Sequence, residues 1–109
     1  MGRAFLGEFE QRVLLAILRC DAKATPIEIR REVLRASGHE PSRGAFYTTL
    51  DRLEGKGLLR SWEGAPTAQR GGRRRKFYGL RPAGITAMRH AYHAFRSMAD
   101  GLEGHLEPK

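Results

Sequence analysis

Near the start of the chain, hydrophobic residues return every three or four positions. Over residues 6–20, "LGEFEQRVLLAILRC", these positions are Phe9, Val13, Ala16, Ile17 and Cys20. This spacing predicts an amphipathic helix that buries one face against the rest of the fold. The segment "DAKA" that follows interrupts the pattern.

Two further helices are marked by their start signals. In "TPIE", Thr25 is the expected N-cap, Pro26 takes the first helical position and Glu28 lies three residues after the cap. The Thr25 hydroxyl and the Glu28 carboxylate can then each accept from the backbone N–H of the other residue. This helix should stop at Gly38. The next helix follows "HEP", has Ser42 as its N-cap and runs through "RGAFYTTLDRLEGKG".

The third helix separates apolar from polar side chains. At about 100° per residue, Phe46, Leu50 and Leu53 fall on one face. The opposite face carries Gly44, Tyr47, Thr48 and Asp51, with Arg43 and Arg52 at its flanks. We therefore expect the apolar face to pack on the first two helices and the polar face to remain open.

Two short strands follow the three helices. The first is "LLRSWEG", with Leu59 and Trp62 as inward anchors, and the second is "RRKFYGL", with Phe77 or Tyr78 as its anchor on the core. The connecting segment "APTAQRGGR" is rich in turn residues, so the pair reads as a β-hairpin. Because this loop is longer than a tight turn, its tip should project from the domain.

After Pro82, "AGITAMRHAYHAFRSMADGLEGHL" predicts one long helix. Its apolar positions are Ile85, Met88, Tyr92, Phe95, Ala99, Leu102 and Leu106. Their spacings alternate between three and four, which is the heptad seam of a helix that pairs with another helix. We therefore divide the chain into a domain over residues 1–81 and a C-terminal dimerisation helix over 82–109. The sequence leaves open whether this helix pairs with its twin or folds back on its own domain.

Positive charge is concentrated in one part of the chain, whose net charge is +8. Residues 64–81 hold six basic side chains and no acidic one, whereas the rest holds 14 basic and 12 acidic residues. Five of the six lie within the hairpin segment "QRGGRRRKFY": Arg70, Arg73, Arg74, Arg75 and Lys76. Such a cluster is typical of a protein that binds a polyanion. The alternative is a solvated loop, against which the mutual repulsion of the cations argues.

Other kinds of chemistry find little support. The single cysteine, Cys20, excludes an intrachain disulfide and a cysteine-based zinc site, and we expect it to be a buried thiol. His90 and His93 have a metal-binding spacing but no third ligand, so we expect no metal and no cofactor. Neither a catalytic arrangement nor a phosphate-cradling motif is present, so we expect no enzyme. The longest apolar run, "VLLAIL", is too short to span a bilayer, and we expect a cytoplasmic protein without a membrane partner.

Three helices followed by a hairpin is the order of a winged helix-turn-helix, a mainly α fold with a small β-hairpin. The third helix would enter the major groove of double-stranded DNA, which is about 12 Å wide, and the hairpin would be the wing. The expected DNA-binding residues are Ser42, Arg43, Gly44, Tyr47, Thr48 and Arg52 on the helix and Arg70, Arg73, Arg74, Arg75 and Lys76 on the wing. Ser42, Arg43 and Thr48 would read bases, whereas Tyr47, Arg52 and the wing would position the protein on phosphates. Gly44 would let the helix backbone approach the DNA closely.

Each helix residue also has a structural interpretation. Tyr47 could be a partly buried aromatic, and Thr48 a solvated side chain. Gly44, which costs roughly 1 kcal/mol relative to alanine in a helix, could be an irregularity of the helix start. Arg52 could pair with Asp51 or Glu54 instead of a phosphate.

Three segments together resemble a known family. "LGEFEQRVLLAIL", "SRGAFYTTLDRLEGKGLL" and "GAPTAQRGGRRRKFYGLRPAG" are similar to PadR-type transcriptional regulators over about residues 6–90. The resemblance implies a homodimeric winged-helix repressor that binds a near-palindromic operator. It also implies that Tyr47 lies at the DNA surface, that Arg73 to Arg75 face the DNA backbone or minor groove, and that the C-terminal helix mediates dimerisation. Phe46 and Phe77 depart from the commonest family residues but remain apolar.

A competing hypothesis is a non-specific nucleic-acid or protein-interaction module, with the wing and the third helix as its docking surface. The two hypotheses differ in whether Arg43 and Thr48 set a sequence preference. The sequence identifies neither the operator nor the regulated genes, and it does not reveal a small-molecule effector.

Overall fold

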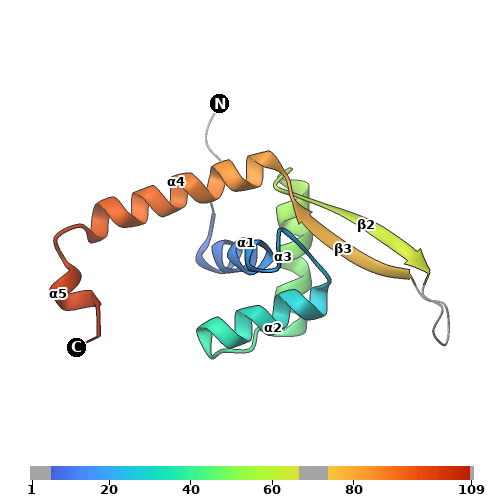
Figure 1. The fold of residues 1–109 in the computed structure, drawn as a ribbon, viewed down its shortest axis with the longest axis horizontal. Helices are drawn as coiled ribbons and strands as arrows, with labels where there is room; N and C mark the ends of the chain where they lie inside the picture. The colour runs from blue at the N-terminus through green and yellow to red at the C-terminus, as the bar shows by residue number, and fades with distance from the viewer. Residues whose placement is uncertain (1–5, 67–73, 109) are drawn as a thin grey trace.

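Three helices make up the body of the fold in the computed structural model, which describes residues 6–66 and 74–108. They are α1 (Glu8–Arg19), α2 (Pro26–Ser37) and α3 (Arg43–Gly55), and a short strand, β1 (Lys23–Ala24), precedes α2. The strands β2 (Leu59–Pro66) and β3 (Arg74–Leu80) follow, and the helices α4 (Pro82–Ala99) and α5 (Glu103–Leu106) end the chain. In Figure 1 the hairpin and the far part of α4 project from opposite sides of the helical body.

The predicted helix boundaries of α2 and α3 are confirmed. Thr25 Oγ1 accepts from the Glu28 N–H at 3.3 Å, and the Thr25 N–H donates to the Glu28 carboxylate at 2.8 Å. Gly38 closes α2 in the left-handed conformation, with φ of 72°. Ser42 Oγ accepts from the Ala45 N–H at 3.2 Å and so begins α3. These contacts satisfy backbone groups that have no partner inside a helix.

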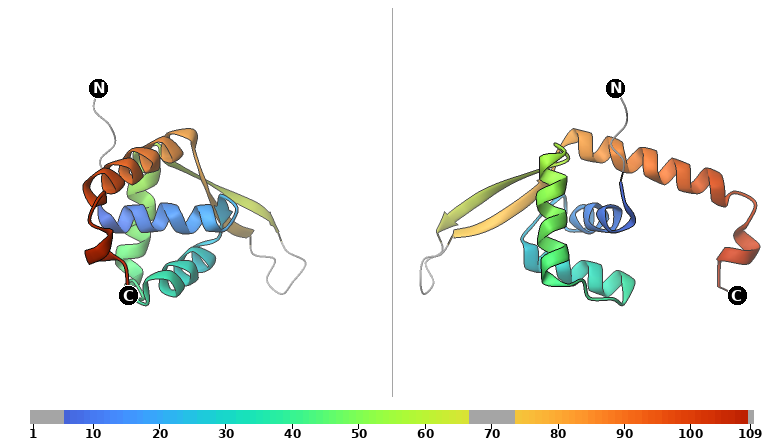
Figure 2. Two further views of the ribbon diagram at one scale, coloured as in Figure 1. Left: turned by 60° about the vertical axis from the view of Figure 1, so that its left-hand side comes forward. Right: turned by 180° about the vertical axis from the view of Figure 1, so that it is seen from behind.

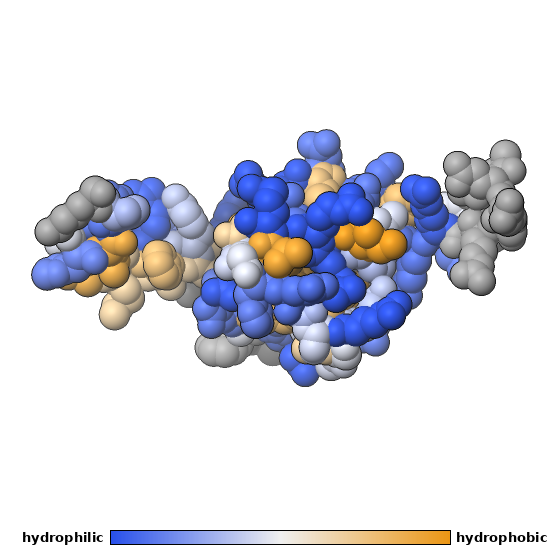
Figure 3. All heavy atoms as spheres, turned by 90° about the horizontal axis from the view of Figure 1, so that it is seen from below, coloured by the Kyte–Doolittle hydropathy of each residue, from blue (hydrophilic) through white to orange (hydrophobic). Residues whose placement is uncertain are grey.

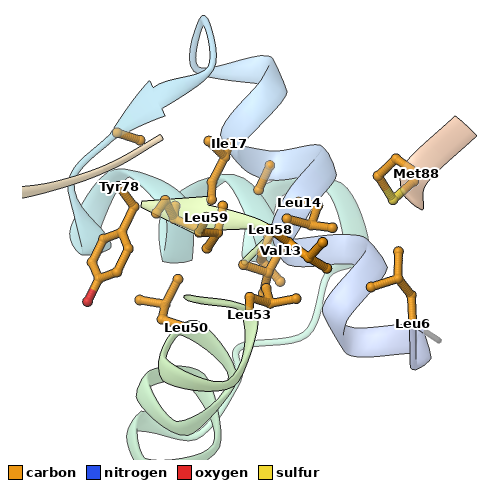
Figure 4. Packing of buried hydrophobic residues seen from close by; sticks show 14 of the residues in the cluster. Leu6, Val13, Leu14, Ile17, Leu50, Leu53, Leu58, Leu59, Tyr78 and Met88 are labelled. Carbon is orange, nitrogen blue, oxygen red and sulfur yellow. The ribbon is translucent and has the colours of Figure 1, made fainter. Parts of the chain in front are cut away.

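The core lies where α1, α3 and the sheet meet. Figure 4 shows Val13, Leu14 and Ile17 of α1 beside Leu50 and Leu53 of α3, with side chains of the sheet between them. Phe46, Leu50 and Leu53 are completely buried, which confirms the predicted inner face of α3. Burying each such side chain stabilises the fold by about 1.5–3 kcal/mol. Because α3 packs on the core through this inner face, the opposite face of α3 makes no core contacts.

The sheet has three strands rather than the two of the predicted hairpin. Its order is β1-β3-β2, and all neighbours are antiparallel. The added strand pairs Lys23 with Gly79 and Ala24 with Tyr78. Two residues are too few to show the alternation of a strand, so sequence reasoning saw only an interruption in "DAKA".

The hairpin has a core face and an outer face. Leu59 and Tyr78 belong to the core, as predicted. The prediction that Trp62 also points inward is wrong. Side chains alternate along a strand, so Trp62, three residues after Leu59, lies on the opposite face. Trp62 instead pairs with Phe77 across the strands, and their ring centroids are 5.8 Å apart. The Arg60 guanidinium lies 4.2 Å from the centroid of the Trp62 ring.

The last helix packs on the domain only through its first turns. Gly84, Ala87 and Met88 are buried there, and a Cβ at Gly84 would collide with the Leu58 carbonyl oxygen. Beyond them α4 extends away from the body, as the right-hand view of Figure 2 shows. No helix within the described ranges 6–66 and 74–108 is long and apolar enough to cross a membrane.

The uninterrupted helix predicted through residue 106 is wrong. The helix α4 ends at Ala99, Asp100 is not helical and Gly101 has a φ of 85°. A left-handed residue at this position turns the chain, so that α5 runs across the direction of α4 at its far end (Figure 1). A continuous heptad seam over residues 85–106 therefore does not exist in one chain.

Candidate nucleic-acid interface

The polar face of α3 is open to solvent. Gly44, Tyr47, Thr48 and Asp51 are all exposed, as are the flanking residues Ser42, Arg43 and Arg52. They lie opposite the completely buried Phe46, Leu50 and Leu53. Sequence reasoning therefore brought together a set of side chains that the structure also places on one surface.

Gly44 has no structural reason to be a glycine. A Cβ at this position would meet no atom within 4 Å, and the residue has an ordinary helical backbone. The cost of glycine in a helix is therefore not offset by packing inside the protein. Close approach of another molecule to this helix would offset it.

The structural alternative holds for Tyr47, which is partly buried, but not for Arg52. Tyr47 keeps 39 % of its surface exposed, and its ring meets the edge of the buried Phe46 ring at a centroid distance of 5.3 Å. That contact holds the Tyr47 ring while its outer part remains in solvent. In residues 6–66 and 74–108, no ion pair joins Arg52 to Asp51 or Glu54.

The start of α3 is held by Arg30 of α2. Its guanidinium Nη2 donates to the Pro41 carbonyl at 3.2 Å and to the Glu40 carboxylate at 3.3 Å. The same guanidinium lies 5.8 Å from the centroid of the Phe46 ring. Sequence reasoning missed Arg30 because its partners lie in the next connection and have no fixed spacing from it.

The end of α3 is held by a partly buried ion pair with α1. Lys56 Nζ lies 3.0 and 2.9 Å from the two carboxylate oxygens of Glu10, which also accepts the Gly7 N–H at 2.8 Å. Burial alone raises the pKa of Glu10, but the bonds from Gly7 and Lys56 outweigh it, and the net shift is downward. Glu10 is therefore a charged side chain buried at the junction of α1 and α3.

The wing lies beside α3 and is joined to it by a hydrogen bond. The Ser61 hydroxyl of β2 donates to the Glu54 carboxylate of α3 at 2.7 Å. Lys76 shares this face of the hairpin, and its Nζ lies 5.3 Å from the centroid of the Tyr78 ring. The pKa of Lys76 is raised first by the Tyr78 hydroxyl and then by the carboxylates of Glu54 and Asp51.

The predicted wing cations fall partly outside the described residues. Arg70 and Arg73 lie there, and of Arg74 the structure describes the backbone, at the start of β3. Arg75 and Lys76 are exposed on opposite faces of that strand. The outer face also carries Lys23, whose Nζ lies 5.5 Å from the centroid of the Phe77 ring.

Known proteins that resemble this chain fit the arrangement of an open helix face beside a basic hairpin. A model of the family described as "Transcriptional regulator PadR-like family" matches residues 14–90. The chain belongs to the PadR-like family. It is a transcriptional regulator of winged-helix fold, and members of this family are regulators rather than enzymes.

Solved structures support the fold of this PadR-family chain. A winged-helix DNA-binding protein from STIV matches with a TM-score of 0.73 at 16% identity, covering 90% of this chain and 98% of that one. A PadR family regulator from Clostridium difficile matches with a TM-score of 0.69 at 23% identity, covering 90% of this chain and 98% of that one. A PadR family regulator from Eggerthella lenta matches with a TM-score of 0.65 at 24% identity, covering 93% of this chain and 89% of that one. No curated protein matches the sequence.

The residues predicted for dimerisation divide into two groups. Met88 is 7% exposed and packs in the core of its own domain, and Ile85 is half-buried. Farther along, large hydrophobic side chains stay exposed: Tyr92, Phe95, Leu102 and Leu106. Met98, which sequence reasoning missed, is 79% exposed. The space-filling view in Figure 3 shows hydrophobic side chains gathered on the α4–α5 end, at the left.

A second apolar surface lies between α1 and α2 of this PadR-family protein. An open groove of about 690 Å³ is lined by apolar residues, including Leu15, Leu18 and Val33, and by arginines at its rim. Leu15 and Leu18 keep 46% and 38% of their surface exposed. Ion pairs hold much of the rim, because Glu32 contacts both Arg19 and Arg35.

Side chains with metal-binding chemistry do not gather in the described part of the chain. No group of three His, Cys, Asp or Glu residues there could hold a metal ion. Cys20 is half-buried, and burial raises the pKa of its thiol, as do Glu28, Glu32 and Asp21.

Proposed function

We propose that this PadR-family regulator represses transcription by binding a near-palindromic operator as a homodimer, with α3 in the major groove. One observation carries the proposal, namely that the polar face of α3 is open to solvent beside a basic hairpin. The helix is short enough to lie in a groove about 12 Å wide. A bound dimer covers promoter DNA and so excludes the transcription machinery.

The helix residues and the wing have different roles in this complex. Ser42, Arg43 and Thr48 contact base edges, while Tyr47 and Arg52 contact phosphates on either side. Gly44 lets the helix backbone approach the DNA, because no Cβ stands between them. The wing contacts the adjacent backbone or minor groove through its cations, namely Arg70, Arg73, Arg74, Arg75 and Lys76.

The C-terminal segment joins the two subunits. In this arrangement residues 1–81 form the DNA-binding domain and residues 82–109 the dimerisation segment. Support comes from the projecting half of α4, whose Tyr92 and Phe95 are 53% and 70% exposed. Exposed apolar side chains that gather in one patch, rather than singly, are typical of interaction surfaces. The dimer would place two copies of α3 about 34 Å apart, one turn of DNA.

A selection from random DNA duplexes at physiological salt tests the proposal. We expect an enriched motif with two halves related by two-fold symmetry and with centres about 10 base pairs apart. A motif without symmetry would contradict the dimer. Enrichment of no motif would instead favour a non-specific nucleic-acid or protein-interaction module.

Replacing Tyr47 by phenylalanine should weaken binding without changing the motif. The substitution removes one hydroxyl from each subunit, and two lost hydrogen bonds to phosphate correspond to about 10- to 100-fold in affinity. Fluorescence anisotropy on the selected duplex and on single-base variants measures the effect. A loss that depends on the base sequence would place Tyr47 on a base rather than on a phosphate.

Replacing Phe95 by glutamate should separate the subunits. The change removes an apolar contact from each subunit and adds repelling charges, so the dimer dissociation constant should rise at least about 100-fold. Sedimentation equilibrium measures the association. Ser97→Glu is the matched control, because Ser97 is exposed on the other side of the same helix. Equal association of both variants would contradict an interface at Phe95.

A further inference from the structure

Asp51 lies on the centre line of the open face of α3. Seven residues separate it from Gly44, which at about 100° per residue brings the two within about 20° of each other around the helix axis. Both point away from the buried Phe46, Leu50 and Leu53. Tyr47 and Thr48 flank this line, and Arg43 and Arg52 lie farther out. The charges are thus ordered, with an acid in the middle and cations at the edges.

The Asp51 carboxylate has no direct contact with a cation or a hydrogen-bond donor in the described parts of the chain, although its charge acts on Lys76 from beyond ion-pair distance. No hydrogen bond or ion pair joins it to another residue in 6–66 or 74–108. Glu54, one turn farther along, provides the contrast, because it accepts the Ser61 hydroxyl at 2.7 Å and so faces the wing. Asp51 is exposed instead, and its carboxylate oxygens are free to meet a ligand of the helix.

An acidic side chain on a DNA-binding face lowers the affinity for DNA unless it meets a hydrogen-bond donor. Phosphates line both walls of the major groove, and like charges near one another lower affinity. The flanking cations Arg43 and Arg52 can contact the phosphates along the walls of the groove. A side chain on the centre line points at the floor of the groove, where the base edges lie and where the phosphates are farthest away.

The floor of the major groove offers donors at only two bases. Cytosine presents its N4 amino group, and adenine presents N6 beside the acceptor N7. Guanine presents two acceptors, and thymine an acceptor and a methyl group. A carboxylate can only accept, so the adenine N7 repels it and cytosine is its best partner.

We propose that Asp51 is a specificity-determining residue that accepts a hydrogen bond from the N4 amino group of a cytosine in each half-site. The inference rests on the proposed function, because it requires α3 in the major groove. The carboxylate rejects guanine and thymine at this position by repulsion from their acceptors. Asp51 therefore contributes base preference, whereas the surrounding cations contribute affinity.

Parallel duplex selections with the unaltered chain, Asp51→Asn and Asp51→Ala test the inference. The unaltered chain should prefer cytosine at one position of each half-site by about 5- to 150-fold. Asp51→Ala should lose this preference alone. Asp51→Asn should exchange it for adenine, because an asparagine amide pairs with adenine N6 and N7. The other positions of the motif should stay as they are.

Glu54→Gln is the matched control, because it removes the same charge from the next turn of α3. It should strengthen binding to all sequences alike and leave the motif unchanged. Circular dichroism and urea unfolding verify that each variant keeps its fold.

Two results would overturn the inference. If the unaltered chain selects a clear motif and Asp51→Asn selects the same one, Asp51 reads no base, while the proposed function stands. If Asp51→Asn changes only the overall affinity, Asp51 acts instead by positioning the wing through Lys76. If the unaltered chain itself selects no motif, the proposed function fails, and the inference fails with it.

Discussion

Affinity for operator DNA should fall about 10³–10⁵-fold between about 50 and 200 mM salt, and removing wing cations should flatten this dependence. The first expectation follows if about 6–10 phosphates are neutralised per dimer, because each contact releases bound counterions. Arg74 and Arg75 are adjacent at the start of β3, and Arg75 is exposed. In the proposed complex one or both of these residues contact a phosphate in each subunit.

The double variant Arg74→Gln, Arg75→Gln should thus lose two to four phosphate contacts per dimer. We expect the slope of log affinity against log salt to fall by about two to four, and the affinity at about 150 mM salt to fall about 30- to 1,000-fold. The same loss should appear on the operator and on unrelated DNA. Anisotropy titrations at five salt concentrations measure the slope.

The pair Arg89→Gln, Arg96→Gln provides the control for net charge. Both residues are exposed on α4, away from the wing and α3. This variant removes the same two charges and should change the slope by less than about one. Equal slopes for the two double variants would show that the wing acts through overall charge and not through contact with DNA.

Replacing Lys56 by methionine should destabilise the protein by about 2–3 kcal/mol at neutral pH, because it leaves the Glu10 carboxylate buried without its cation. The Glu10 side chain is 7% exposed and that of Lys56 30%, so the pair is partly screened and the effect lies below that of a fully buried pair. Urea unfolding at fixed protein concentration measures the difference.

The loss should depend on pH in a defined direction. The pKa of Glu10 lies below its ordinary value of 4.5 in the folded chain. A lowered pKa stabilises the folded state above the ordinary value, and this contribution disappears as the pH falls through the folded value. The difference between the two proteins should therefore be largest at neutral pH and shrink as the pH falls below 4.5 and through the lowered pKa of Glu10.

The double variant Glu10→Gln, Lys56→Met completes the test. Glutamine keeps an oxygen for the Gly7 N–H and carries no charge, so the double variant should be more stable than Lys56→Met alone at neutral pH. A difference that stays constant from pH 7 to 3 would contradict the ion pair. It would show that Lys56 acts through its hydrocarbon chain alone.

Local features of the fold could be predicted from the sequence because their causes lie within a few residues. The cap at Thr25 and the stop at Gly38 involve neighbours along the chain. The inner face of α3 follows from helical spacing alone. The break after Ala99 has a local cause as well, the left-handed Gly101, but the apolar spacing on both sides concealed it.

Contacts between distant parts of the chain could not be predicted in this way. Glu10 and Lys56 are 46 residues apart, and nothing in the sequence around either residue indicates that the two are paired. Arg30 and the Pro41 carbonyl, like Ser61 and Glu54, meet only because the helices and the hairpin pack as they do. The outward position of Trp62 and the burial of Met88 were likewise set by packing.

For the candidate interface, the sequence alone was enough to show which side chains share the polar face of α3 and where positive charge is concentrated, because helical periodicity and composition are local properties. Folding establishes that this face is open, that Gly44 has no packing role, and that Asp51 forms no hydrogen bond or ion pair in the described residues while Glu54 is held by the wing. Exposure and pairing depend on which elements meet, and the chain settles that only when it folds.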